Sequence, residues 1–326
     1  MLALTAAVIS NQRTAHAKAP EATPYIAPET GTETLDGPRP AGGSEQLWYE
    51  RSAIDLNRDL GDVVNILLIG TDERLPGDYD RGRGDVTMLC SLNRTDGSVR
   101  LVSFERSTGV PWPGHGDVML TNTFTYGGPE LTAGDISRCF NVDIDGYMHV
   151  DFELFREIID ALGGIDIELT AQEARALAED SYYEYSFDEG MNQMDGESAL
   201  LYCRLRRIDD NWHRVERQRN MVQAVLTKSK SIKLSDIPGL ARVVIPMVDT
   251  NLSREQLAAL AVAAPKFRGA SAMQMTVPDR NYIWVYNGAE EGLTGCDYGK
   301  ESGRIREFLS RPAEIQTGQI PEPEAG

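Results

Sequence analysis

The sequence predicts an α/β protein, a three-layer α/β/α sandwich with a central mixed β-sheet. Residues 63–70 and 86–93 form continuous apolar runs, which are typical of strands buried on both faces of a sheet. A Thr95-Asp96-Gly97 turn joins the second run to another at residues 99–104, so these two runs should form a hairpin. Farther along the chain, short apolar runs alternate with helical patterns, and we expect those helices to cover both faces of the sheet.

The remaining elements follow from apolar periodicity and from turn residues. We expect further strands at residues 147–150, 165–169 and 272–277. We expect helices at residues 45–60, 129–140, 152–162, 212–228, 253–263 and 303–309, with Asp151 capping the third of them. Residues 122–128 are predicted to be a loop and residues 188–196 a turn-rich segment, whereas residues 197–205 fit a helix or a strand.

Composition divides the chain into four parts. Residues 1–10 are apolar but too short to cross a bilayer, and we interpret them as the remnant of an N-terminal membrane helix that starts before Met1. The alternative is a disordered tail. Residues 11–44 are rich in Pro, Thr, Ala, Gly and Glu, which predicts a disordered linker. Residues 45–311 should form one folded domain whose informative motifs lie in residues 63–230, followed by a disordered tail at residues 312–326.

The net charge restricts the partners of the protein. A formal charge of −18 disfavours nucleic acid, because binding to its phosphates depends on lysine and arginine. Any anionic substrate must therefore be bound by a local basic cluster. The four cysteines are widely spaced and form no metal-binding pair, and Cys90 and Cys203 are expected to be buried thiols.

Two acids lie where the first two predicted strands meet their connecting segment. Asp72 follows the first strand, and Asp85 begins the second directly after Arg83 and Gly84. If the two strands are neighbours in one sheet, both carboxylates reach the same edge. Such an arrangement predicts either a site for a divalent metal ion and a phosphate group, or a salt-bridge cluster.

A second cluster is unusually basic for so acidic a chain. Arg204 and Arg206 alternate with apolar residues, and Arg214, Arg217 and Gln218 share one face of the predicted helix. Arginine forks suit phosphate oxygens, because each fork can donate two charge-assisted hydrogen bonds. A pyrophosphate would carry enough negative charge to hold several of these arginines together.

Two further arginines in this cluster have a plainer interpretation. Arg207 and Arg219 are expected to form ion pairs with nearby acids on a solvated helix, among them Asp209, Asp210 and Glu216.

The chain resembles the LytR-CpsA-Psr proteins over residues 63–230. The resemblance is carried by seven short motifs that occur in the family's order and approximate spacing. They are Gly70-Thr71-Asp72-Glu73-Arg74, Arg83-Gly84-Asp85, Val102-Ser103-Phe104-Glu105-Arg106, Tyr126-Gly127-Gly128-Pro129, Ala161-Leu162-Gly163-Gly164-Ile165, Asp195-Gly196-Glu197-Ser198-Ala199-Leu200, and Arg204-Leu205-Arg206 followed by Arg214-Val215-Glu216-Arg217-Gln218.

This resemblance implies a phosphotransferase of cell-wall assembly. Such proteins carry a single N-terminal membrane helix and an extracytoplasmic catalytic domain. They move a glycopolymer, such as a teichoic acid, from a polyprenyl-pyrophosphate carrier to peptidoglycan through a phosphodiester bond. The resemblance also implies an apolar tunnel between sheet and helices for the lipid.

The resemblance also assigns roles to residues. Asp72 and Asp85 would hold Mg²⁺ against the pyrophosphate, and together with Arg83 and Arg106 they would form the catalytic group. The implied pyrophosphate-binding residues are Arg83, Arg106, Arg204, Arg206, Arg214, Arg217 and Gln218. The chemistry agrees, because phosphoryl transfer needs positioning and charge neutralisation, and Asp72 or Asp85 could accept the proton of the acceptor hydroxyl.

The chain departs from the family pattern at two positions. Ser107 stands where the family usually has aspartate, and Met119 stands near a frequent lysine. These departures favour an alternative function, a non-enzymatic polyprenyl-phosphate binder with a regulatory or scaffolding role. A third reading is a pyrophosphatase that uses water as the acceptor. His115 and His149 are expected to be ordinary surface or core histidines.

Overall fold

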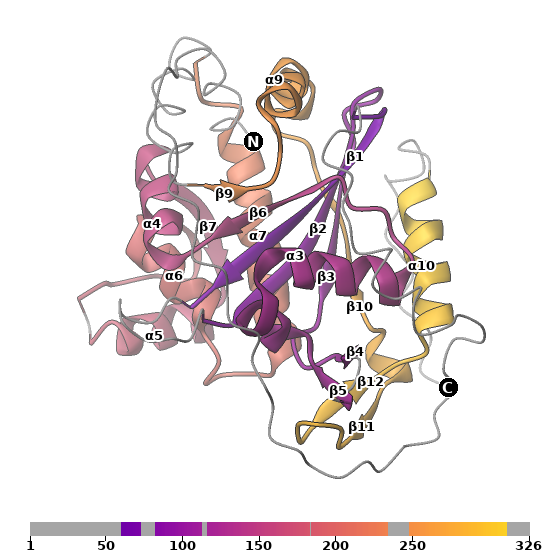
Figure 1. The fold of residues 1–326 in the computed structure, drawn as a ribbon. Coiled ribbons are helices and arrows are strands. Elements are labelled where there is room, and N and C mark those ends of the chain that lie inside the picture. The colour runs from indigo at the N-terminus through magenta and orange to yellow at the C-terminus, as the bar shows by residue number, and fades with distance from the viewer. Residues whose placement is uncertain (1–59, 73–81, 113–115, 183, 234–247, 312–326) are drawn as a thin grey trace, which may run out of the picture.

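The computed structural model describes residues 60–72, 82–112, 116–182, 184–233 and 248–311 (Figure 1). Its centre is a six-stranded sheet in the order β10-β3-β2-β1-β6-β9. The pairs β1–β6 and β10–β3 are parallel, whereas β1–β2, β2–β3 and β6–β9 are antiparallel. The mixed central sheet predicted from the sequence is therefore confirmed.

The secondary structure of the described residues has the following bounds. The sheet strands are β1 (Val63–Thr71), β2 (Gly84–Asn93), β3 (Val99–Phe104), β6 (Gly146–Val150), β9 (Asp249–Thr250) and β10 (Met273–Val277). Three two-stranded sheets pair β4 (Gly109–Trp112) with β5 (Gly116–Met119), β7 (Ile165–Leu169) with β8 (Gly190–Met194), and β11 (Trp284–Tyr286) with β12 (Leu293–Gly295). The helices are α3 (Leu120–Phe140), α4 (Phe152–Ala161), α5 (Ala171–Asp180), α6 (Gly196–Arg204), α7 (Asn211–Lys228), α9 (Arg254–Ala263) and α10 (Tyr298–Ser310), with 3₁₀ turns η3 (Ala264–Phe267) and η4 (Arg280–Tyr282).

Alternating side chains of the central strands are buried on opposite faces of the sheet. In β1, Leu67 and Ile69 pack into one core, and Val64 and Ile66 pack into the other. This alternation explains the continuous apolar runs, because a strand that is covered on both faces buries the side chains of both faces.

Helices cover each face, as the predicted three-layer sandwich requires (Figure 1). Residues of α3 and α10 belong to the core cluster that contains Leu67 and Ile69, and residues of α7 and α9 belong to the cluster on the opposite face. A third cluster joins α4, α5, α6 and α7 to the β7–β8 pair. The last third of the chain thus supplies both an edge strand, β10, and part of the helical cover.

Two local predictions were wrong and one open choice is decided. Residues 122–128, predicted to be a loop, lie in α3, whose only non-helical residue is Gly128, with a φ of 71° at the kink. Residues 190–194 form β8 rather than a turn, because they pair with β7, and the local sequence does not predict that long-range pairing. The undecided residues 197–205 are helical through Arg204.

The remaining predicted strands and helices that lie in the described residues are present. Asp151 caps α4 as expected, its side chain accepting a hydrogen bond from the backbone N–H of Leu154 at 2.7 Å. The predicted membrane remnant, the linker, most of the 45–60 helix and the C-terminal tail lie outside the described residues. Within the described ranges, no helix combines the length and hydropathy that crossing a bilayer requires.

Candidate functional site

Asp72 and Asp85 meet at one edge of the sheet, as predicted. Strands β1 and β2 are antiparallel, and their register ends with Thr71 opposite Gly84. The Asp72 Oδ1 accepts a hydrogen bond from the backbone N–H of Arg83 at 2.7 Å, which ties the two strand ends together. Gly82 makes this closure possible, because its φ is +77° and a Cβ there would lie 2.5 Å from the Asp72 carbonyl oxygen.

Asp85 lies between two arginines that come from distant parts of the chain. Its Oδ1 is 3.1 Å from Nη2 of Arg106, and its Oδ2 is 3.6 Å from Nη2 of Arg206. The Asp85 side chain is about a quarter exposed, so a ligand can reach it. The tertiary structure therefore joins the acid-bearing motif to both predicted arginine motifs.

Nearby arginines and carboxylates shift the pKa of Arg206 in opposite directions. Partial burial lowers the pKa of Arg206, and the Asp85 carboxylate opposes that shift. The guanidinium groups of Arg106 and Arg204 lower this pKa further, and Asp72 raises it. Three arginines and two carboxylates thus lie within electrostatic range of one another, which leaves a net positive charge that favours an anionic ligand.

The end of α6 positions Arg204 and Arg206. Asp195 caps the start of this helix, and buried Leu205 follows its last residue, Arg204. The Arg204 guanidinium lies 4.6 Å from the ring centre of Phe152, at a distance typical of a cation–π contact. Both guanidinium groups stay near the surface, where they can rearrange around a ligand.

Arg214 is buried and forms no ion pair with the other described residues. Its side chain is among the largest fully buried ones, and its Nε and Nη2 have no hydrogen-bond partner among the described residues. Gln218, one turn farther along α7, is also buried. Burying guanidinium nitrogens without hydrogen-bond partners is costly, and such a group is a candidate for binding an anion. No hydrogen bond or ion pair in the described part of the chain joins Arg214 to Asp85.

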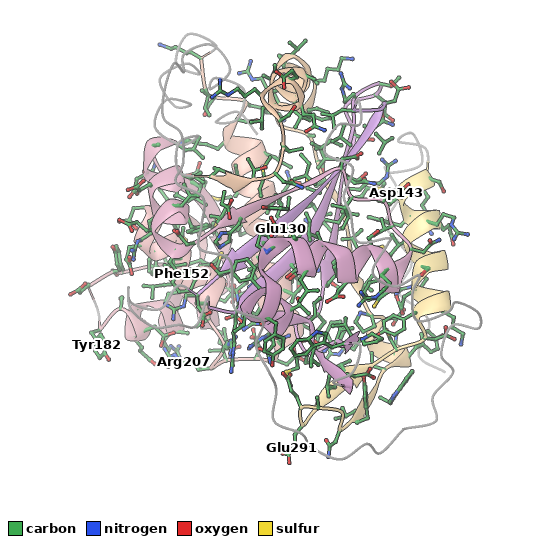
Figure 2. All side chains as sticks on the ribbon, in the orientation of Figure 1. Glu130, Asp143, Phe152, Tyr182, Arg207 and Glu291 are labelled. Atoms are coloured by element: carbon green, nitrogen blue, oxygen red, sulfur yellow. The ribbon has the colours of Figure 1, made fainter. Side chains whose placement is uncertain are left out.

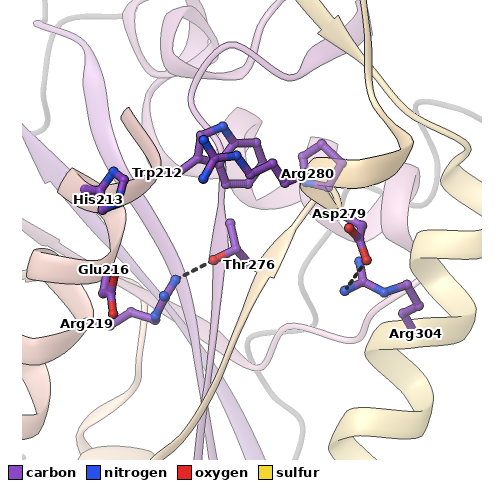
Figure 3. A pocket seen from close by; sticks show the side chains of 9 residues that line it. Trp212, His213, Glu216, Arg219, Thr276, Asp279, Arg280 and Arg304 are labelled. Carbon is purple, nitrogen blue, oxygen red and sulfur yellow. Dashed lines mark hydrogen bonds and ion pairs between the residues drawn. The ribbon is translucent and has the colours of Figure 1, made fainter. Parts of the chain in front are cut away.

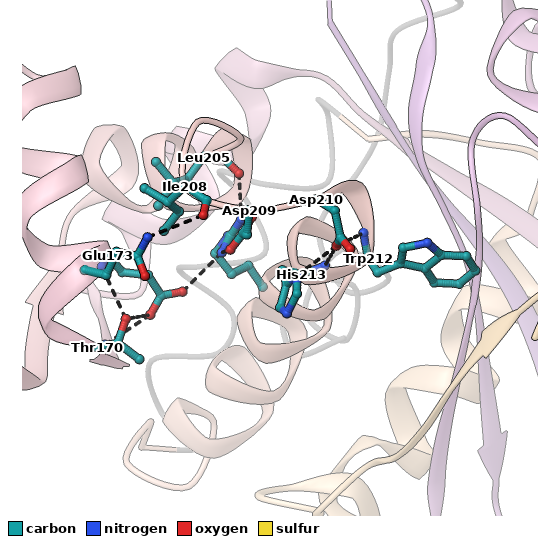
Figure 4. Close-up of polar contacts among 10 residues, drawn as sticks. Thr170, Glu173, Leu205, Ile208, Asp209, Asp210, Trp212 and His213 are labelled. Carbon is teal, nitrogen blue, oxygen red and sulfur yellow. Dashed lines mark hydrogen bonds and ion pairs between the residues drawn. The ribbon is translucent and has the colours of Figure 1, made fainter. Parts of the chain in front are cut away.

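Arg217, unlike the other predicted phosphate ligands, is both buried and paired with an acid. Its two terminal nitrogens contact both carboxylate oxygens of Asp209 at 2.6 Å, and it also contacts Glu173 and the Leu205 carbonyl. Figure 4 shows this network between α5 and the start of α7. With its charge already neutralised inside the protein, Arg217 is better explained as a structural cross-link, and we leave it out of the proposed pyrophosphate site.

The two arginines given the plainer interpretation differ from each other. Arg207 lies at the periphery of the molecule and pairs with Glu179 and Asp180, so it is a surface ion-pair residue as predicted, with different partners (Figure 2). Arg219 makes no ion pair among the described residues. It donates hydrogen bonds to the side chains of Gln274 and Thr276 on β10 instead.

Arg83 is exposed, and its backbone N–H bonds to Asp72, whereas its side chain makes no hydrogen bond or ion pair with the other described residues. The residue that precedes Arg106, Glu105, belongs to a hydrogen-bond network that the sequence did not reveal. The neighbouring Glu105 is 4% exposed and accepts hydrogen bonds from Ser107 and from the Asn211 side chain. Burial raises the pKa of Glu105, although these donors and Arg106 oppose the shift.

His149 is a second residue whose place the sequence did not reveal. Its Nε2 lies 2.7 Å from Oγ1 of Thr71, next to Asp72, and its Nδ1 faces Asp249 at 3.6 Å. The parallel pairing of β1 with β6 places it there, because Ile69 and His149 are opposite one another. Only the strand order could have identified this neighbour.

The donor set can accommodate Mg²⁺ if the ligand shares in its coordination. Mg²⁺ prefers oxygen ligands, commonly one or two carboxylates with phosphate oxygens and water. Asp72 and Asp85 offer such carboxylates, and the described residues contain no cluster of three or more acidic, His or Cys side chains that could bind a metal alone. Together, the mixed sheet and the acid–arginine cluster define an α/β protein with a candidate anion-binding site.

The chain belongs to the LytR_cpsA_psr family, whose model matches residues 42–297. It is 28% identical over 231 residues to the polyisoprenyl-teichoic acid–peptidoglycan teichoic acid transferase TagT of Bacillus subtilis, covering 69% of this chain and 71% of TagT. It is 35% identical over 178 residues to the transferase TagU of Oceanobacillus iheyensis, covering 52% of each chain. This chain therefore spans about half of the TagU relative.

A solved structure shows the same fold. The structure of the LytR-CPS2A-psr family protein YwtF (TagT) with bound octaprenyl pyrophosphate lipid superimposes with a TM-score of 0.59 at 21% identity. The match covers 78% of this chain and 92% of that one.

Proposed function

We propose that this protein is a phosphotransferase that moves a glycopolymer from a polyprenyl-pyrophosphate carrier to peptidoglycan through a phosphodiester bond. The observation that carries the proposal is the position of Asp85 between Arg106 and Arg206, with Asp72 and Arg204 within electrostatic range. The names of the relatives support the substrate class, because both are transferases of teichoic acid from a polyisoprenyl carrier to peptidoglycan.

The chemistry assigns the arginines to the pyrophosphate. The acceptor hydroxyl oxygen attacks the sugar-linked phosphorus, the bond from that phosphorus to the bridging oxygen breaks, and polyprenyl phosphate leaves. Arg106, Arg204 and Arg206 offset the charge on the phosphate oxygens, with Arg83 and Arg214 as further candidate ligands. Asp72 or Asp85 accepts the proton that the hydroxyl releases.

Mg²⁺ is part of the proposal. Asp72 and Asp85 would hold the ion, which when bound would supply further charge neutralisation on the pyrophosphate. The apolar tunnel for the prenyl chain also stays a prediction.

We further propose a membrane location for the whole protein. The substrate carries a prenyl chain, and the acceptor is the cell wall, so the catalytic domain would work on the extracytoplasmic side of the membrane. A single N-terminal membrane span would hold it there.

Two measurements test the proposed function. Mass spectrometry of lipids extracted from the purified protein should detect a co-purified prenyl phosphate or pyrophosphate. An assay with a lipid-linked saccharide and peptidoglycan oligomers should then yield a phosphodiester-linked product and free polyprenyl phosphate.

The same assay distinguishes the alternatives. Lipid binding without turnover would identify the non-enzymatic binder, for which Ser107 in place of the family aspartate is the supporting feature. Hydrolysis without transfer would identify a pyrophosphatase. Absence of both binding and turnover would contradict the proposal.

A further inference from the structure

A recess near the candidate site contains none of the residues assigned to the pyrophosphate. Its volume is about 310 Å³, within the size range of small-molecule sites. Figure 3 shows it between α7, the end of β10 and α10. The lining consists of Trp212, His213, Glu216, Arg219, Thr276, Pro278, Asp279, Arg280 and Arg304.

Strand pairing places this recess next to the candidate site. Strand β10 runs parallel to β3 with Val277 opposite Phe104, and the Glu105 N–H donates to the Val277 carbonyl at 2.8 Å. Pro278 and Arg280 therefore leave the sheet at the same edge as Arg106, whose guanidinium contacts Asp85.

Hydrogen bonds at the start of α7 connect the recess to the candidate site. Asp210 caps this helix and accepts a hydrogen bond from Arg280 at 2.6 Å on the recess side. The next residue, Asn211, donates to Glu105, which precedes Arg106. Figure 4 shows Trp212 projecting from this helix start, away from the Asp209 side of the network.

The three arginines of the recess differ in their partners. Arg280 is paired with Asp210, and Arg304 is paired with Asp279 and Glu301. Arg219 instead donates hydrogen bonds from Nε and Nη1 to the neutral side chains of Gln274 and Thr276. Burial lowers its pKa, and Glu216 opposes this shift without forming an ion pair with it. Arg219 is therefore the cation of the recess that gains most from an anionic ligand.

The other lining groups suit a sugar. A tryptophan face provides a flat apolar surface with a polar edge, on which a pyranose ring can stack. Glu216 is exposed and has no hydrogen bond or ion pair among the described contacts, so it can accept from sugar hydroxyl or amide groups. A carboxylate on the same molecule would meet Arg219 through charge-assisted hydrogen bonds.

We propose that this recess binds the acceptor, a carboxylate-bearing muramoyl-peptide unit of peptidoglycan, with its sugar on Trp212 and its carboxylate at Arg219. The inference rests on the proposed function, because a transferase needs a second saccharide next to its pyrophosphate site. The hydrogen-bonded connection from Arg280 through the start of α7 to Glu105 would place that acceptor beside Arg106 and the donor phosphate.

Binding of N-acetylmuramoyl dipeptide to the full chain tests the inference. Uncharged di-N-acetylchitobiose is the comparison ligand, and calorimetry or chemical-shift titration gives both dissociation constants. We expect the muramoyl dipeptide to bind more tightly, and Arg219→Met to weaken its binding about tenfold and to abolish the preference. Trp212→Ala should weaken both ligands.

The matched controls are Arg207→Met and Trp284→Phe, because Arg207 is a surface ion-pair residue and Trp284 is exposed outside the recess. Both should bind the muramoyl dipeptide like the wild type. The inference is overturned if the wild type binds neither ligand, or if Arg219→Met and Trp212→Ala both bind the dipeptide as the wild type does. Because Arg219 also bonds to β10, the Trp212→Ala result decides alone if Arg219→Met does not fold.

A parallel titration with a short-chain polyprenyl pyrophosphate separates this inference from the proposed function. Arg219→Met and Trp212→Ala should bind the pyrophosphate lipid as the wild type does. A wild type that binds the dipeptide but no pyrophosphate lipid would contradict the proposed function and leave the recess as a saccharide site. A wild type that binds the lipid but no dipeptide would overturn only the acceptor recess.

Discussion

The Asp85 Oδ2 lies 3.6 Å from Nη2 of Arg206, although Asp85 is the second residue of β2 and Arg206 follows α6. Among the described residues, Asp85 is the acid that forms an ion pair with both Arg206 and Arg106. A bound pyrophosphate would take over that role and free the carboxylate to hold a metal ion or to accept a proton.

Asp85→Asn tests this exchange. The amide keeps the shape of the side chain but can neither bind Mg²⁺ well nor act as a base, so we expect turnover of the lipid-linked substrate to fall at least about a hundredfold. Binding of the pyrophosphate lipid should stay within a few-fold, because the arginines remain. Rates should be measured over a Mg²⁺ titration and after chelation with EDTA.

The control for this substitution is Asp166→Asn, on the exposed side of β7. It should leave turnover unchanged. Wild-type turnover in Asp85→Asn, or wild-type turnover after chelation, would contradict the proposed metal role.

Arg214→Met should separate stability from binding. Because the Arg214 guanidinium is buried and lacks partners at Nε and Nη2, an apolar replacement should raise the free energy of unfolding by about 1–3 kcal/mol. If Arg214 binds the pyrophosphate, the same variant should lose lipid affinity. Urea unfolding gives the first quantity, and the ligand-induced rise in Tm gives the second.

Lys228→Met, at the last turn of α7, is the control and should alter neither quantity appreciably. A lipid-induced rise in Tm that is as large in Arg214→Met as in the wild type would remove Arg214 from the site.

Arg217→Met should act on stability rather than on the ligand. The substitution leaves Asp209 without its bidentate partner inside the protein, so we expect a loss of about 3–5 kcal/mol in the free energy of unfolding. Arg207→Met removes an exposed pair and should change stability little. Urea unfolding compares the stability of the two variants. If folded Arg217→Met loses affinity for the pyrophosphate lipid, Arg217 belongs to the pyrophosphate-binding residues after all.

Glu105 should make stability depend on pH. Burial raises its pKa in the folded state above the ordinary value of 4.5, so the folded protein retains a proton that the unfolded chain has released. Its contribution is therefore fully present below about pH 4.5 and is lost as pH rises through the folded-state pKa. The wild type should lose stability relative to Glu105→Gln between pH 4.5 and pH 8 in urea unfolding.

Glu307→Gln, near the exposed end of α10, is the matched control for this comparison. A difference between wild type and Glu105→Gln that stays constant over this pH range would contradict the burial argument.

Ser107→Asp, which restores the residue usual in the family, should be costly here. The Ser107 hydroxyl and N–H both donate hydrogen bonds to Oε2 of buried Glu105. An aspartate at position 107 would therefore bring a second carboxylate next to that of Glu105, where little water screens their repulsion. We expect the free energy of unfolding to fall by about 1–3 kcal/mol at pH 7, with recovery in the double variant Ser107→Asp/Glu105→Gln. No recovery would mean that the two positions are not coupled.

The sequence by itself determined the layers of this protein. Apolar runs without alternation required strands covered on both faces, and the helical pattern of residues 212–228 was long enough to be unambiguous. The sequence was weaker where structure depends on pairing between distant segments. Residues 190–194 became a strand because β7 lies beside them, and Gly128 interrupts a helix that packing nevertheless maintains on both sides.

For the site, local sequence identified residue types, and tertiary structure decided their partners. The motifs singled out Asp72, Asp85, Arg106 and Arg206, which the fold brings to one edge of the sheet. Helical spacing placed Arg214 and Arg217 on one face but could not show that Asp209 neutralises only the second. Charge pairing depends on distances of a few ångströms between remote segments, and only the packed chain fixes those distances.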